Sequence, residues 1–310
     1  MIFLIQFICN KQADYRQGEE KIMFESWGRS WQLVKASWAV LLSDKELLWF
    51  PVISGIVTVL ICIVMFIPSV VVSVTLFSTG AGEGVTQVFG FAGLFIFYLV
   101  TYTISIYFNT ALIGATMIRL DGGDPTMKDG FQIANSRLSK IIGFAAMSAT
   151  VGVVIRFLQE RGGLLGNIVS WLGGIAWNLA TFLVIPILVT HDIGPIEAVK
   201  RSTALLRETW GEQITGNWSI GGIFAIAYIL LVLVGIGLAF FAGAVLESVT
   251  GVIAVVSLIV ILFVILGIIQ GALNGIYQAA LYRYAESGIA PDNFDISLIQ
   301  GAFKEKKKKR

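Results

Sequence analysis

Residues 248–282 read SVTGVIAVVSLIVILFVILGIIQGALNGIYQAALY and contain no Asp, Glu, Lys or Arg. Five further stretches of the 310-residue chain share this property: 47–82, 84–118, 141–155, 162–190 and 213–246. A helix needs about 20 predominantly apolar residues to cross a bilayer, and the hydrocarbon core admits only helices and closed barrels. The strands of a membrane barrel are shorter, at about 10 residues, and alternate in polarity. The sequence therefore predicts an all-α, polytopic membrane protein.

We expect six transmembrane helices near 49–77, 88–118, 140–158, 164–190, 216–243 and 252–282. If Lys140 and Arg156 are assigned to the connections that they adjoin, one side of the membrane, with both termini, carries 20 Lys and Arg residues and the other side carries two. Cationic residues concentrate in cytoplasmic connections. We therefore expect a multi-pass protein with both termini in the cytoplasm.

The two ends of the chain differ from the membrane domain, which we place at 23–290. Residues 1–22 begin with a short apolar stretch that lacks the cationic leader and cleavage site of a signal peptide. Met23 precedes the first patterned segment, so our hypothesis is that translation starts there and that 1–22 is a non-native or disordered extension. Residues 291–310 form a cytoplasmic basic tail.

The tail ends in six cations that could attract anionic lipid at about 1 kcal/mol each: Lys304, Lys306, Lys307, Lys308, Lys309 and Arg310. No folded basic domain accompanies them, so we do not expect nucleic-acid binding. Retention of topology is the simpler interpretation.

Three cation-rich connections share one order of residues, which is a cationic or titratable residue, an acid, a glycine and a proline. They span Arg119–Pro125, His191–Pro195 and Arg283–Pro291. Glycine ends a helix readily and proline suits the first turn of the next one. Apolar residues at helical spacing follow the first two prolines and also precede the first span. The sequence thus predicts three transmembrane hairpins, each preceded by an amphipathic interfacial helix, as an internal repeat over roughly 25–118, 125–190 and 195–282.

The amphipathic helices have two interpretations. They could close the cytoplasmic side and join the hairpins, or they could form a ring that binds the membrane surface or a partner. Tryptophan is enriched at membrane interfaces. The candidate interfacial anchors are Trp27, Trp31, Trp38 and Trp210.

Uncharged polar residues follow stripes in the second, fourth and sixth spans. The candidate intramembrane polar site comprises Ser105, Asn109, Asn178, Gln270, Asn274 and Gln278. Beside it, Gly267, Gly271 and Gly275 form two overlapping G-x-x-x-G units, which are candidate helix-packing positions. The stripes could be packing contacts, with hydrogen bonds worth about 0.6 kcal/mol each, or could line a polar cavity for a lipid headgroup or a small solute.

Composition argues against catalysis. There is one histidine, His191, and there are two cysteines, Cys9 and Cys62, so common zinc and di-iron sites cannot be assembled and no disulfide framework can be read. No acid or base lies deep in a predicted span, which argues against ion-coupled transport. We expect no cofactor, no metal and no enzymatic activity.

Two motifs resemble known membrane proteins. Residues 37–51 read SWAVLLSDKELLWFP and are followed by Ser54-Gly55; residues 194–202 read GPIEAVKRS. The first is similar to the opening of a prokaryotic family of uncharacterised integral membrane proteins with about six spans, and the second is distantly similar to the membrane domain of glycerophosphoryl diester phosphodiesterases. The resemblance implies the six-span architecture and the cytoplasmic membrane of a prokaryote. It carries no catalytic residues, and the soluble phosphodiesterase domain is absent.

Two hypotheses about function follow. The first is a non-enzymatic membrane scaffold that associates with lipid, an unknown membrane partner or copies of itself. The second is a permease or lipid-handling carrier whose site is formed by the uncharged polar stripes.

Overall fold

The computed structural model describes residues 28, 30–80, 82–210, 219–245 and 247–300, and all regular secondary structure within them is helical. Six segments are long and apolar enough to cross a membrane: Lys45–Leu76, Gly84–Leu120, Leu138–Arg161, Gly163–Thr190, Ile220–Val245 and Val249–Ser287. The prediction of six apolar spans is therefore confirmed, including the short third span. The predicted N-terminal extension, Trp27 and the cations of the tail lie outside the described residues.

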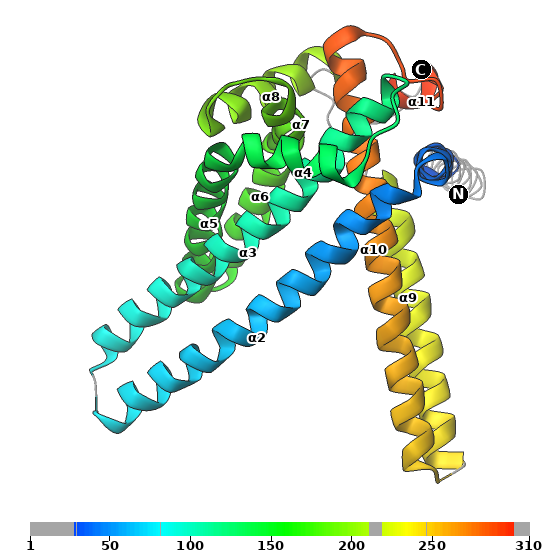
Figure 1. Ribbon diagram of the computed structural model, residues 1–310. Helices are drawn as coiled ribbons and strands as arrows, with labels where there is room; N and C mark the ends of the chain where they lie inside the picture. The colour runs from blue at the N-terminus through cyan, green and yellow to red at the C-terminus, as the bar shows by residue number, and fades with distance from the viewer. Residues whose placement is uncertain (1–27, 29, 81, 211–218, 246, 301–310) are drawn as a thin grey trace, which may run out of the picture.

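The elements follow one another with short connections (Figure 1). A helix at 30–43 precedes η1 (Lys45–Leu48), α2 (Trp49–Ser78), α3 (Glu83–Leu120), α4 (Met127–Ser136), α5 (Leu138–Arg161) and α6 (Gly163–Ala180). The rest of the chain forms α7 (Val184–Thr190), α8 (Pro195–Trp210), α9 (Ser219–Phe240), the π-helical η2 (Phe241–Val245), α10 (Val249–Ser287) and α11 (Ile296–Gln300).

Local chemistry explains where two of these helices begin or end. A capping box starts α4, because the Thr126 hydroxyl accepts from the Asp129 amide while the Asp129 carboxylate accepts from the Thr126 amide. Gly288 ends α10 in the left-handed conformation, with φ of 72°, which a glycine adopts without strain.

The fourth span is interrupted near Pro186. The chain makes a turn at 181–183, between α6 and α7. The amide of Leu183 donates to the hydroxyl of Ser202 in α8, at 3.1 Å, instead of bonding within its own helix. Pro186 lacks an amide hydrogen, so it cannot bond the carbonyl of Phe182. A buried contact with α8 thus satisfies an amide in the three-residue break between α6 and α7.

The packed core lies at the end of the molecule where the three cation-rich connections meet. It comprises the C-terminal halves of α3 and α10 with the helices around them, and it includes Phe50, Leu112, Ile141, Leu188, Trp210 and Ile276, each at most 1% exposed. The central element is α3, which packs against α2, α4, α5, α7 and α10.

Two helix pairs leave this core, and we call them the arms. The first arm is α2 with residues 83–105 of α3, and the second is α9 and η2 with residues 249–271 of α10. Figure 1 shows the two arms running from the same end of the molecule and diverging, while α5 and α6 lie beside α3. No described side chain of α2 beyond Pro51 is buried, and the same holds for α10 before Ala272.

Candidate functional site

The three cation-rich connections are joined to one another by ion pairs. Asp121, after α3, pairs with Arg283 near the end of α10. Glu286 of α10 accepts from Arg201 of α8 at 2.6 Å and lies 3.3 Å from Nε2 of His191. The connections that the sequence presents as separate are therefore one polar layer over the core.

A hydroxyl pair continues this layer toward the core. The Tyr282 hydroxyl of α10 lies 2.7 Å from the Thr190 hydroxyl at the end of α7 and 3.1 Å from Nε2 of His191. The only histidine of the chain thus contacts both a tyrosine and a carboxylate, and it links α7 to α10.

Asp192 ties the connection before α8 to the start of α5. Its carboxylate accepts from Lys140 and from Arg137. The hydrogen bond from Lys140, together with the charges of Lys140 and Arg137, holds the pKa of Asp192 below its usual range.

The connection after α3 is tied to the start of α2. Arg119 donates to the hydroxyl and to the carbonyl of Ser43, each at 3.3 Å, and it pairs with Asp124. Glu46 accepts from the first amide of α4, that of Met127, at 3.0 Å. The residues 43–46 of the first motif therefore make structural contacts.

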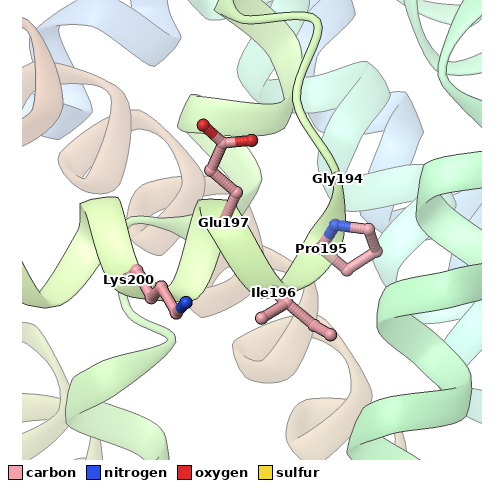
Figure 2. Close-up of a pocket in the computed structure, with 5 residues that line it drawn as sticks. All are labelled: Gly194, Pro195, Ile196, Glu197 and Lys200. Carbon is pink, nitrogen blue, oxygen red and sulfur yellow. The ribbon is translucent and has the colours of Figure 1, made fainter.

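A shallow open pocket lies at the start of α8, and Figure 2 shows its five lining residues. The Glu197 carboxylate and the Lys200 ammonium point in different directions, beside Gly194, Pro195 and Ile196. These groups do not converge on one point, so the pocket offers no paired acid and base. Within the described part of the chain, no group of three or more His, Cys, Asp or Glu residues could hold a metal ion.

The six residues of the candidate polar site do not form one cluster. Gln270 accepts from the Tyr228 hydroxyl of α9 at 3.0 Å. Asn109, Asn274 and Gln278 are half-buried, whereas Ser105 and Asn178 are exposed. Among the residues that the structure describes, the side chains of these last five make no hydrogen bond. The main packing partners of α6 are α5 and α8.

The three stripe glycines of α10 face three different helices. A Cβ at Gly267 would lie 3.6 Å from the Tyr228 hydroxyl of α9, and one at Gly271 would lie 3.4 Å from Cβ of Pro51 in α2. At Gly275 it would lie 3.0 Å from Cγ of Leu112 in α3 and even closer to Cδ2. The stripe is thus no single interface, and the tightest approach is between α10 and α3.

The candidate tryptophan anchors occupy two environments. Trp31 and Trp38 are 46% and 39% exposed on one face of helix 30–43. Trp210 is 1% exposed, and its indole N–H donates to the carbonyl of Ile299 at 3.0 Å. The Trp210 ring therefore packs against protein on all sides, unlike an interfacial anchor.

These observations define a multi-pass membrane protein whose six apolar helices are joined at one charged end. The chain belongs to a family of unknown function (DUF6159), whose profile matches residues 88–291. The matched region contains α3 from residue 88 onward, all of α4 to α10 and the three joined connections. No curated protein and no solved structure matches the chain.

Proposed function

We propose that the protein is a non-enzymatic membrane scaffold whose charged core holds two hairpin arms apart in the bilayer. Lipid or a second copy of the chain would occupy the surfaces that the arms present to one another. The main support for this proposal is the exposure of both arms. No described side chain of α2 beyond Pro51 is buried, and none of α10 before Ala272 is buried.

The chemistry of these exposed surfaces supports the proposal. Ile63, Phe66 and Val70 of α2 and Ile229, Leu233 and Ile236 of α9 are all more than two-fifths exposed. Lipid tails are as apolar as these side chains, so such helices need no protein partner to be stable in a membrane. A scaffold can therefore present them to lipid or to another copy.

The test is the composition of the particle extracted with its own lipid. The protein is purified in lipid nanodiscs and in mild detergent, and native mass spectrometry measures its mass in each. We expect either retained lipid or a dimer in both media. A monomer that carries no lipid in either medium would contradict the scaffold.

A lipid-handling carrier is the second candidate, favoured by the half-buried Asn109, Asn274 and Gln278, which have no hydrogen-bond partner in the described residues. Changing all three to Leu separates the two candidates. A carrier should lose its bound lipid while keeping its fold, whereas a scaffold should keep its mass distribution. Circular dichroism provides the control for folding.

We propose that the charged core faces the cytoplasm of a prokaryotic cell, with both chain ends on that side. The excess of Lys and Arg in the connections of that end supports this orientation. A reporter fused after residue 310 and another inserted at residue 162 should report opposite sides. The same side for both would contradict the assignment.

A further inference from the structure

Helix 30–43 differs from the two other short amphipathic helices in what its outward face displays. The outward face of α4 is polar, with Lys128, Gln132 and Asn135. That of α8 is mostly polar, with Lys200 and Arg207, and has one exposed apolar side chain, Ile196, in its first turn. The outward face of helix 30–43 instead carries Trp31, Trp38 and Leu42, which are 46%, 39% and 54% exposed.

This helix is apolar on two sides. Its inward side packs Leu33, Val40 and Leu41 into the core, where each is at most 4% exposed. At 3.6 residues per turn, Trp31, Trp38 and Leu42 fall within a sector of about 40° on the outward side. A helix with protein on one side and water on the other would not leave two indoles and a leucine in that sector.

The other exposed positions adjoin this sector and are less apolar. Lys35 lies about 40° around the helix from Trp31, and Gln32, Ala39 and Ser43 lie about 80–120° from it. Viewed around its axis, the helix thus presents one buried side and one exposed side, which is aromatic at one edge and more polar at the other.

Two observations identify the medium on the aromatic side. Trp49, which begins α2 a few residues after this helix, is 54% exposed, so a further exposed indole lies at the start of the first arm. Figure 1 shows the dark-blue helix nearly end-on while the arms run across the picture, so its axis lies across the arms. A helix in this orientation beside a membrane span lies in the plane of the bilayer.

The charge on this face also suits lipid. Lys35 lies between the two indoles, and its ammonium is 5.8 Å from the ring centre of Trp31. A lysine with an apolar stem can reach the headgroup phosphates while neighbouring tryptophan rings sit at headgroup level.

We propose that helix 30–43 is a membrane-surface helix, with Trp31, Trp38 and Leu42 inserted at the headgroup level and Lys35 paired with lipid phosphate. Helices α4 and α8 cover the core and face water. The inference depends on the membrane embedding of the protein and not on what the arms hold.

The test compares two neighbouring positions of the same helix. Cys9 and Cys62 are replaced by Ser, and a nitroxide label is attached to Trp38→Cys or to Ala39→Cys in protein reconstituted into phosphatidylcholine vesicles containing phosphatidylglycerol. Electron paramagnetic resonance then measures label accessibility to oxygen, which concentrates in lipid, and to a water-soluble nickel chelate. We expect the oxygen-to-nickel ratio at Trp38→Cys to be several times the ratio at Ala39→Cys.

Three results would overturn the proposal. Equal ratios with high nickel accessibility would mean that the aromatic face meets water. Shielding of Trp38→Cys from both reagents would mean that protein, including a second copy, covers it. A high ratio at Lys200→Cys of α8 would mean that helix 30–43 is not distinct from the other short helices. Unchanged circular dichroism of each labelled variant controls for misfolding.

Discussion

Gly275 marks the closest approach of α10 to α3, and its role can be tested with a single methyl group. In Gly275→Ala the new Cβ would meet the side chain of Leu112, which is 1% exposed and would have to shift within the packed core. We expect the free energy of unfolding to fall by about 1–3 kcal/mol, as for other overpacked cores. Unfolding by sodium dodecyl sulfate, monitored by circular dichroism, measures this decrease in the free energy of unfolding.

Gly267→Ala is the matched control, because its Cβ would make an ordinary 3.6 Å contact. An equal decrease in both variants would show that the close approach at Gly275 does not limit stability.

Asp44 combines a capping role with an unfavourable environment. Its carboxylate accepts from the Glu46 amide at 3.1 Å, yet the residue is 7% exposed, and burial raises its pKa above the usual range. A raised folded-state pKa means that the folded protein binds this proton more tightly than the unfolded chain, so the contribution of Asp44 to stability decreases as pH rises through that pKa.

The substitution Asp44→Asn keeps the capping oxygen and removes the titration. We expect Asp44→Asn to leave the free energy of unfolding at pH 7 unchanged or to increase it, and to remove the part of its pH dependence that comes from Asp44. Asp44→Ala, in contrast, loses the cap, and we expect its free energy of unfolding to fall by about 0.5–2 kcal/mol. Thermal unfolding of the three proteins between pH 4 and pH 8 measures the effect. If Asp44→Asn lowered the free energy of unfolding at pH 7 as much as Asp44→Ala does, the negative charge of the carboxylate itself would stabilise the fold.

At the scale of elements, the interruption between α6 and α7 depends on one hydroxyl. Ser202 and Leu183 are both 0% exposed, so removing the hydroxyl leaves the Leu183 amide buried without a partner. We expect Ser202→Ala to lower the free energy of unfolding by about 1–3 kcal/mol. Thr203→Ala is the control, because that exposed hydroxyl bonds only carbonyls of its own helix. If the two variants are equally stable in detergent unfolding, the hydroxyl does not maintain the interruption.

The contrast between α7 and the other elements shows what the sequence could reveal. Six spans follow from uncharged runs and helical spacing, which are local properties of the chain. Pro186 is a local signal for the interruption at 181–183, but the contact that satisfies the Leu183 amide is not local, because it requires Ser202 to reach that amide. The same holds for Trp210, which the sequence presents as a candidate interfacial anchor, whereas the structure buries its ring and bonds its indole to the carbonyl of Ile299. The repeated helix-plus-hairpin unit stays a prediction.

The candidate site was predictable only in its parts. Charged residues in each cation-rich connection are visible in the sequence, but the pairing of Asp121 with Arg283 and of Arg201 with Glu286 joins positions far apart in the chain. Likewise, the prediction of one intramembrane polar site requires the second helices of the three hairpins to face a common interior. Instead, α6 packs mainly on α5 and α8, and Asn178 is exposed.

At the scale of the whole molecule, helix length places the core relative to the bilayer. The part of α10 that belongs to the second arm, residues 249–271, spans about 35 Å at 1.5 Å per residue. The hydrocarbon thickness of a bilayer is about 30 Å. The arm alone is therefore long enough to cross the membrane, and we infer that the ion-paired end of α10, at Arg283 and Glu286, lies outside the hydrocarbon region.

Divergence of the arms makes a prediction about distances that a closed six-helix bundle does not make. Spin labels at Val74→Cys in α2 and Val249→Cys in α10, both exposed positions, would report the separation of the far ends of the arms in nanodiscs. Packed helices lie about 8–10 Å apart axis to axis. We expect a distance distribution clearly longer than that between Val74→Cys and Val88→Cys, which lie within the first arm. Double electron–electron resonance measures both pairs in a background with Cys9 and Cys62 replaced by Ser. Similar short distances for the two pairs would mean that the arms close on one another in lipid, and the scaffold would then lose the surfaces on which lipid or a second copy is proposed to sit.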